Sequence, residues 1–164
     1  MDNKPEVLVI MGSASDWDTM KECAKKLDEF KISYEKHIAS AHRTPALAAE
    51  LAATAAKRGV KVIIAAAGGA AHLAGVLASQ TALPIIGVPM KGWALDGLDS
   101  LLSTVQMPKG MPVFTLAIGK AGAVNAAVGA LQILALSNPQ KAETLAKFRA
   151  KQTQDVLNAK FPEE

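Results

Sequence analysis

The chain has 164 residues, a formal net charge of +3 and hydrophobic side chains at 50% of its positions, with aromatic residues at only 4%. This length suits one domain around a single core, and the high apolar content excludes a disordered chain. The basic residues are scattered and no run of about 18 apolar residues occurs, so we expect neither a nucleic-acid-binding nor a membrane-spanning protein.

Apolar runs alternate with helical patterns through most of the chain. The first run, Val7–Met11, is continuous, which is typical of a strand buried on both faces of a parallel sheet. Ser15 is the expected N-cap of the helix that follows. The further predicted elements are helices at about 16–30, 44–59 and 71–80 and strands at 33–38, 61–66, 84–88 and 113–117. This alternation predicts an α/β fold with a doubly wound parallel five-stranded sheet in the flavodoxin-like order 2-1-3-4-5.

Two later segments have a different character, and both bear on assembly. Residues 121–136 form a helical pattern with almost no charge. A helix that is apolar all round must be buried all round, which favours a subunit interface over a purely internal helix. Residues 139–158 are charged with sparse apolar positions, a pattern that fits a helix lying on a neighbouring subunit or on its own domain. We expect one α/β domain over 1–164, with a C-terminal helical arm (about 139–164) that packs on a neighbouring subunit.

Three loops carry the residues suited to chemistry. They are Gly12–Asp16 after the first strand, Ser40–Pro45 after the second, and Ala67–His72 after the third. In the order 2-1-3-4-5 these strands are neighbours, and ligands bind at the carboxyl ends beside the switch point between strands one and three. The fold rule therefore predicts that the three loops meet.

The first two loops predict an anion site next to a proton carrier. Ser13 and Ser15 offer hydroxyls near a helix start that suits a phosphate, without the pattern of a Walker or dinucleotide loop. Asp16 fits either a first-turn acid or a carboxylate that binds ribose hydroxyls. Arg43 is predicted to clamp an anion with its guanidinium fork. The unperturbed pKa of a histidine, about 6.5, makes His42 suitable for proton transfer near neutral pH.

The third loop fits a pocket wall or a plain turn. Gly68 and Gly69 permit positive φ and a close backbone approach, and His72 either lines the same pocket or completes the turn. We expect no metal site, because the three histidines have no neighbouring acid pair and Cys23 is the only cysteine. The lone cysteine and the absence of an apolar signal-peptide core in residues 1–4 lead us to expect a cytoplasmic protein. Residues 106–110 are a candidate mobile loop, while Trp17 and Trp93 fit a core, interface or pocket-wall position alike.

Four motifs carry a family resemblance that runs from about Val7 to Asp155. The motifs Met11–Trp17, Ser40–Pro45, Ala67–Leu73 and Gln106–Pro108 resemble those of the N5-carboxyaminoimidazole ribonucleotide mutase family of purine biosynthesis, the class I catalytic subunit of phosphoribosylaminoimidazole carboxylase. One departure is Ala74, where the family pattern has proline.

The resemblance implies a cofactor-independent isomerase. Such an enzyme moves a carboxyl group from the exocyclic nitrogen to ring carbon four of a nucleotide, by decarboxylation through transient carbon dioxide and recarboxylation, and it acts as a homo-octamer. By motif position, His42 handles the proton that leaves carbon four. The implied substrate-binding residues are Ser13, Ser15, Asp16, Ser40, Arg43, Gly68, Gly69 and His72.

Three other functions fit the same fold. A flavin carrier is disfavoured by the scarcity of aromatic residues. A receiver-like signalling module needs an aspartate at the end of the third strand, where the chain has Ala65, Ala66 and Ala67. A related carboxylase that takes free carbon dioxide is not separable from the mutase by sequence chemistry, although the motifs resemble the mutase more closely.

Overall fold

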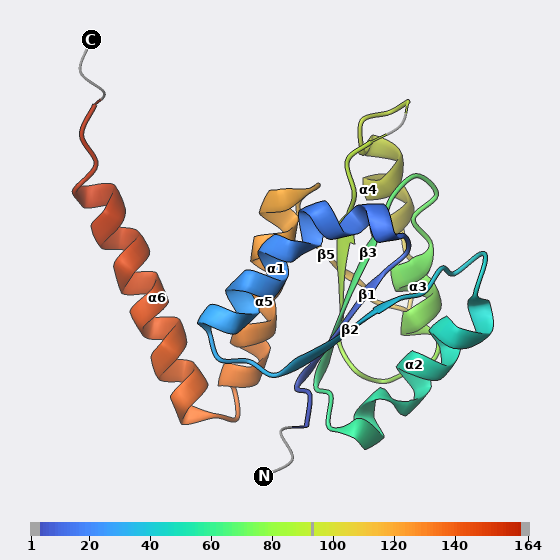
Figure 1. Ribbon diagram of the computed structural model, residues 1–164, viewed down its shortest axis with the longest axis horizontal. Coiled ribbons are helices and arrows are strands. Elements are labelled where there is room, and N and C mark those ends of the chain that lie inside the picture. Colours follow the sequence, from blue (N-terminus) through green and yellow to red (C-terminus); the bar gives the residue numbers. More distant parts are fainter. Residues whose placement is uncertain (1–3, 93, 162–164) are drawn as a thin grey trace.

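The computed structural model describes residues 4–92 and 94–161, and its strands form one parallel sheet in the order β2-β1-β3-β4-β5 (Figure 1). The strands are β1 (Val7–Met11), β2 (Tyr34–Ile38), β3 (Val62–Ala67), β4 (Ile85–Pro89) and β5 (Phe114–Thr115). Every pairing between neighbouring strands is parallel. The predicted fold class and strand order are confirmed.

Helices cover both faces of the sheet (Figure 1). Helices α1 (Trp17–Glu29) and α5 (Lys120–Ala135) lie on one face, and α2 (Pro45–Arg58), α3 (Leu73–Ala78) and α4 (Leu98–Val105) lie on the other. Strand β1 shows why its sequence is continuously apolar. Val7, Val9 and Met11 pack into the core under α1 and α5, whereas Leu8 and Ile10 pack into the core under α2 and α3. Alternate side chains of a strand face opposite sides, so a strand covered on both sides needs no polar position.

Helix α2 begins and ends where its sequence predicts. Pro45 occupies its first turn, and Gly59 ends it with a φ of +107°, a left-handed conformation that favours glycine. Thr44 holds the N-cap position, but its hydroxyl makes no capping bond to the helix. It binds the backbone of Ser40 instead, accepting from the Ser40 amide at 2.8 Å and donating to the Ser40 carbonyl at 3.2 Å. Thr44 therefore closes the loop that carries the predicted site residues.

The nearly uncharged helix α5 is half covered by its own chain. Its inward residues, from Gly122 and Ala123 to Leu131 and Leu134, are buried against the sheet and α1. Ala121, Asn125 and Gln132 on its outward face remain exposed. A subunit interface on this outward face stays a prediction. In the part of the chain that the structure describes, no helix is both long enough and apolar enough to cross a membrane.

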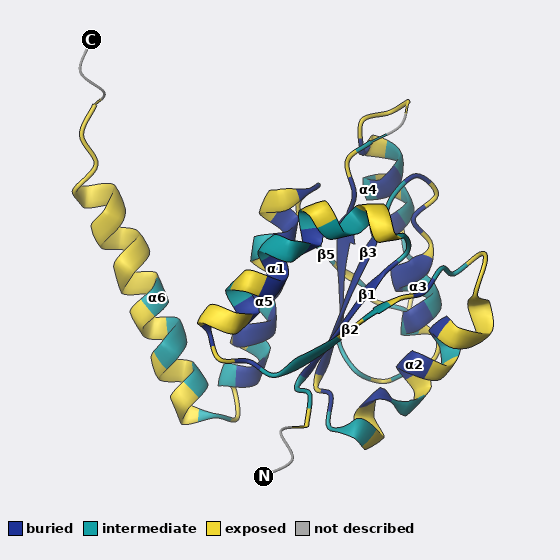
Figure 2. Cartoon of the chain, viewed as in Figure 1, coloured by how far each residue is buried: buried dark blue, intermediate teal, exposed yellow. Residues whose placement is uncertain are grey.

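The C-terminal helix α6 (Pro139–Leu157) is attached at one end only (Figures 1 and 2). In its first half, Phe148 stacks edge-on against Phe30 with ring centroids 5.2 Å apart. Lys141 pairs with Glu6 at 3.1 Å and also donates to the Lys31 carbonyl at 2.8 Å. Its second half is exposed and extends away from the sheet. The first half therefore packs on its own domain, and contact of the second half with a neighbouring subunit stays a prediction.

Candidate active site

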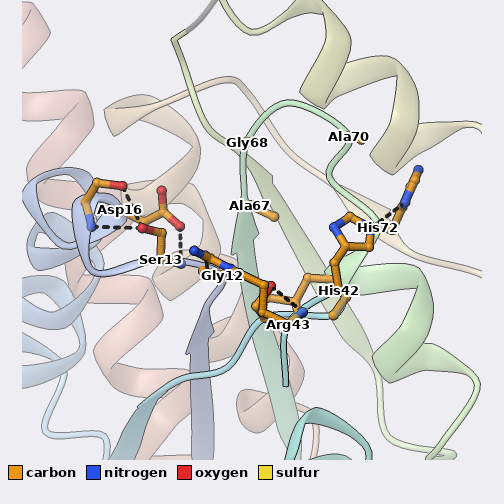
Figure 3. A pocket seen from close by; sticks show the side chains of 13 residues that line it. Gly12, Ser13, Asp16, His42, Arg43, Ala67, Gly68, Ala70 and His72 are labelled. Carbon is orange, nitrogen blue, oxygen red and sulfur yellow. Dashed lines mark hydrogen bonds between the residues drawn. The ribbon is translucent and has the colours of Figure 1, made fainter. Parts of the chain in front are cut away.

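The three predicted loops meet at the carboxyl end of the sheet. Met11 is level with Ile38 of β2 and with Ala66 of β3, so the three strands end side by side. A cavity of about 420 Å³ lies between the loops that follow (Figure 3). Of the predicted site residues it is lined by Ser13, Ser15, Asp16, Ser40, His42, Arg43, Gly68 and His72. The convergence that the fold rule predicts is present in the structure.

The first loop is closed by a capping box. A short 3₁₀ turn (Ala14–Asp16) precedes α1, and Ser13 is the N-cap of this turn. Asp16, not Ser15, holds the N-cap position of α1 itself, without a side-chain capping bond. The Ser13 hydroxyl accepts hydrogen bonds from the Ser15 hydroxyl at 2.9 Å and the Ser15 amide at 3.4 Å. Asp16 in turn accepts from the Ser13 amide at 3.0 Å. The prediction of Ser15 as N-cap is wrong, and both serines remain on the cavity wall.

Burial raises the pKa of Asp16 above the ordinary value of 3.8. The amides of Ser13 and Gly12 and the charge of Arg43 act in the opposite direction, and burial outweighs them. The capping bond supports the interpretation of Asp16 as a first-turn acid. Its position on the cavity wall keeps the carboxylate within reach of a bound ligand, so ribose binding stays a prediction.

Arg43 extends from the second loop to the first. Its Nη2 donates to the Gly12 carbonyl at 3.1 Å, and its Nε and backbone amide donate to the Ser40 hydroxyl at 3.4 and 3.2 Å. Ser40 thus orients the arginine from within the same loop. A guanidinium has five N–H donors, so most of them stay free to bind an anion in the cavity.

His42 and His72 form a hydrogen-bonded pair across the cavity wall (Figure 3). The Nε2 atom of His42 lies 2.9 Å from Nδ1 of His72, and the two rings are perpendicular. From its sequence position His72 fits a wall or a turn, and the sequence does not predict its contact with His42. Thirty positions separate the two residues, so only the alignment of β2 and β3 around β1 brings them together.

The two glycines of the third loop differ in their surroundings. Gly69 has a φ of +63°, the left-handed conformation that the sequence allowed. At Gly68 an added Cβ would lie 3.3 Å from the Cβ of Met90, so the backbone passes close to the end of β4. Gly69 does not line the main cavity. It lines an adjoining cavity of about 220 Å³ that shares Ser15, Asp16 and Gly68 with the main one.

Helix α4 contributes a residue that the sequence analysis missed. The Ser103 hydroxyl accepts a hydrogen bond from the Ala71 amide at 2.9 Å, next to His72 in the chain. It also lies 3.2 Å from the Gly69 carbonyl and 2.7 Å from the Asp99 carbonyl. The apolar spacing of Leu98, Leu101, Leu102 and Val105 was a usable signal for this helix.

The described residues contain no group of three or more His, Cys, Asp or Glu side chains arranged to hold a metal.

Two of the remaining sequence-based candidates, the loop at 106–110 and Trp17, are not part of the cavity wall. The loop at 106–110 does not line the cavity, and the Met107 sulfur lies over Gly75 of α3. Trp17 packs partly against the core beneath α1, with the Lys36 ammonium 4.3 Å from its ring centroid. Trp93 lies outside the described residues.

Comparison with known proteins identifies the family. The model of the family described as AIR carboxylase matches residues 6–155. The chain belongs to the AIR carboxylase family. It is 56% identical to the N5-carboxyaminoimidazole ribonucleotide mutase of Vibrio cholerae serotype O1 over 156 residues, 95% of this chain and 97% of that protein. It is 55% identical to the protein of the same name from Bacillus subtilis, covering 95% and 96% of the two chains.

A solved structure shares the fold of this chain. The crystal structure of Treponema denticola PurE matches with a TM-score of 0.83 at 26% identity, over 93% of this chain and 94% of that one. Ala74, the position at which the resemblance leads us to expect proline, is buried within helix α3.

Proposed function

We propose that this chain is the mutase of de novo purine biosynthesis that converts N5-carboxyaminoimidazole ribonucleotide to 4-carboxyaminoimidazole ribonucleotide. The observation that carries the proposal is the cavity in which His42 and Arg43 face the Ser13–Asp16 loop. The chain is also more than half identical, over nearly its full length, to proteins named for this activity.

The nucleotide phosphate is assigned to the space between the first two loops. The Arg43 fork supplies charge-assisted hydrogen bonds, and Ser13 and Ser15 supply hydroxyls beside the start of a helix. Ser40 assists by orienting Arg43. Because a carboxylate repels phosphate, Asp16 is assigned to the ribose hydroxyls.

The reaction needs a proton carrier and no electron carrier. When the carbamate C–N bond breaks, its electron pair stays on the exocyclic nitrogen, which takes up a proton as carbon dioxide leaves. Ring carbon four, activated as an enamine, then forms a C–C bond to carbon dioxide and loses its own proton. One proton is gained at nitrogen and one is lost at carbon, with no change of oxidation state in the enzyme. We assign both transfers to His42: in its protonated form it gives a proton to the nitrogen, and the neutral ring that results takes the proton of carbon four. We also propose that the enzyme works without a cofactor.

The third loop is assigned to the carbon dioxide. Gly68 and His72 line the main cavity, and Gly68 and Gly69 line the smaller one of about 220 Å³ that adjoins it, so the third loop borders the space where a small neutral molecule could be held. Excluding water from this region also prevents side reactions of the intermediate.

The proposed enzyme is a cytoplasmic homo-octamer, and two exposed apolar surfaces support its assembly. On α4, Leu98, Leu102 and Val105 are 50%, 48% and 46% exposed. At the end of α6, Val156 and Leu157 are 75% and 73% exposed. Contiguous exposed apolar side chains mark protein contacts. Light scattering should give eight times the 17.1 kDa chain mass, and a monomer at micromolar concentration would contradict the assembly.

A carboxylase that uses free carbon dioxide is the second candidate, favoured by the family description alone. A spectroscopic assay decides between the two by supplying either the carbamate nucleotide or the uncarboxylated nucleotide with bicarbonate. Faster turnover of the carbamate nucleotide supports the mutase, and turnover of the second mixture alone supports the carboxylase.

His42→Asn should abolish turnover and keep nucleotide binding, while His37→Asn, outside the cavity, should be as active as the wild type. Normal turnover by His42→Asn would refute the assignment of the proton carrier.

A further inference from the structure

The hydrogen bond between the two histidines leaves only one ring nitrogen of each free. Nε2 of His42 and Nδ1 of His72 share a single hydrogen at 2.9 Å. In the described part of the chain, the remaining nitrogens, Nδ1 of His42 and Nε2 of His72, have no hydrogen-bonding side chain. Any proton that His42 exchanges while the pair is intact must therefore pass through its Nδ1.

The loop that carries His72 is held from two sides. Ser103 accepts from the Ala71 amide at 2.9 Å, and the Thr104 hydroxyl, which donates to the Ser100 carbonyl at 2.7 Å, lies 3.4 Å from the Ala71 carbonyl. Both hydroxyls come from the inner face of α4. Helix α4 therefore fixes the backbone immediately before His72, and this helps to hold the His72 ring against His42.

We propose that His72 is a positioning residue for His42. It accepts the hydrogen of His42 Nε2, which selects the tautomer with a bare Nδ1 and turns that atom to the substrate; Ser103 secures the loop that makes this possible. The inference rests on the proposed function in its assignment of the proton to His42. The hydrogen-bonded pair itself is independent of that assignment.

A neutral partner suits a proton that is both given and taken. When Nδ1 of His42 accepts a proton, the resulting imidazolium keeps its Nε2–H bond to His72, now charge-assisted. A carboxylate in the place of His72 would stabilise the imidazolium further, because it places a full negative charge beside the protonated ring. In the part of the chain that the structure describes, a histidine does lie beside a carboxylate, but it is His37, whose Nε2 is 3.8 Å from Glu35. Neither of these residues lines the cavity.

The first experiment reads the tautomer directly. The sequence has three histidines, so selective ¹⁵N labelling gives few signals, and each is assigned by its own substitution. In the ligand-free wild type, at a pH where the pair is uncharged, His42 should carry hydrogen on Nε2 and none on Nδ1. In His72→Phe, which keeps a ring but no acceptor, His42 should change to a mixture of tautomers. Unchanged His42 signals in His72→Phe, or hydrogen on Nδ1 in the wild type, would overturn the proposal.

The second experiment separates positioning from binding. His72→Phe should lower kcat about 100-fold, within the usual range for general acid–base catalysis, and change KM less than about threefold. His72→Gln, which restores an acceptor, should recover part of the loss. His37→Gln serves as the control and should leave kcat and the His42 signals unchanged. An equal loss in KM would show that His72 binds substrate instead, and an unchanged kcat would refute positioning.

The third experiment acts from a distance. Ser103→Ala removes the acceptor of the Ala71 amide and should lower kcat about fivefold, as expected for one lost hydrogen bond. Ser79→Ala, at the far end of α3, loses a hydroxyl bond to the Val76 carbonyl and should keep full activity. If the wild type itself turns over neither substrate, the proposed function fails, while the NMR result still decides whether the pair exists.

Discussion

Replacing Arg43 by alanine should weaken phosphate and nucleotide binding about 100-fold and leave the fold intact. Without ligand the side chain makes two exposed hydrogen bonds, to Gly12 at 3.1 Å and Ser40 at 3.4 Å, whose loss costs about 1 kcal/mol or less. Three of its five donors remain for an anion. Two charge-assisted bonds to a phosphate contribute about 1.5–3 kcal/mol each. The lower end suits an open cavity, and a total of about 3 kcal/mol corresponds to a hundredfold change in Kd.

Titration calorimetry with inorganic phosphate and with the uncarboxylated nucleotide measures this loss. Arg43→Lys keeps the charge and removes the fork, so it should bind about tenfold more weakly than wild type. Arg149→Ala, on the exposed face of α6, is the control for a lost surface cation and should bind normally. Wild-type affinity in both Arg43 variants, or an equal loss in Arg149→Ala, would refute the anion clamp.

Three further predictions test the site and its frame. Burial raises the pKa of Asp16 above 3.8, so this carboxyl favours folding below pH 3.8 and loses that contribution as the pH rises through its raised pKa. Asp16→Asn should therefore gain stability relative to wild type from acid to neutral pH in urea titrations; a constant difference would contradict this. Burial raises the pKa of Cys23 to about 12, so a thiol reagent at pH 8 should react only on unfolding, and rapid labelling of folded protein would disagree. In Gly122→Ala the new Cβ would clash with the Ala117 carbonyl oxygen, which should lower the free energy of unfolding by about 1–3 kcal/mol. Gly129→Ala, whose new Cβ meets only an ordinary contact with Ile86, should be tolerated, and equal thermal shifts in the two variants would refute the clash.

The meeting of the three loops could be predicted because it depends on strand order alone. Continuous apolar runs such as Val7–Met11 identify buried parallel strands, and five such strands commonly take the order 2-1-3-4-5. The loops after β1, β2 and β3 then reach the same edge whatever their side chains are. Eight of the nine predicted site residues line the main cavity for this reason, and Gly69 lines the cavity beside it.

Contacts that depend on one residue's position in a turn could not be predicted. The capping side chain is that of Ser13, at the start of the 3₁₀ turn that precedes α1, and not that of Ser15, although both serines satisfy the same capping preference. The pairing of His42 with His72 depends on ring orientations in two loops, which composition and spacing do not encode. Sequence reasoning thus predicts which residues gather at the cavity but not the hydrogen bonds among them.

Helix α4 shows why the spacing of apolar residues predicts that a helix forms but not which of its faces is buried. Leu98, Leu102 and Val105 share one face, and the usual rule would turn that face to the core. The structure turns it outward, and Ser100 and Thr104 are buried instead. The inner hydroxyls satisfy themselves on nearby carbonyls, with Ser100 donating to Met90 at 2.6 Å and Thr104 donating to Ser100 at 2.7 Å. The inner face of α4 therefore carries the hydroxyls that bind the loops of the candidate site. Leu98, Leu102 and Val105 face outward, where a neighbouring subunit of the proposed assembly would cover them.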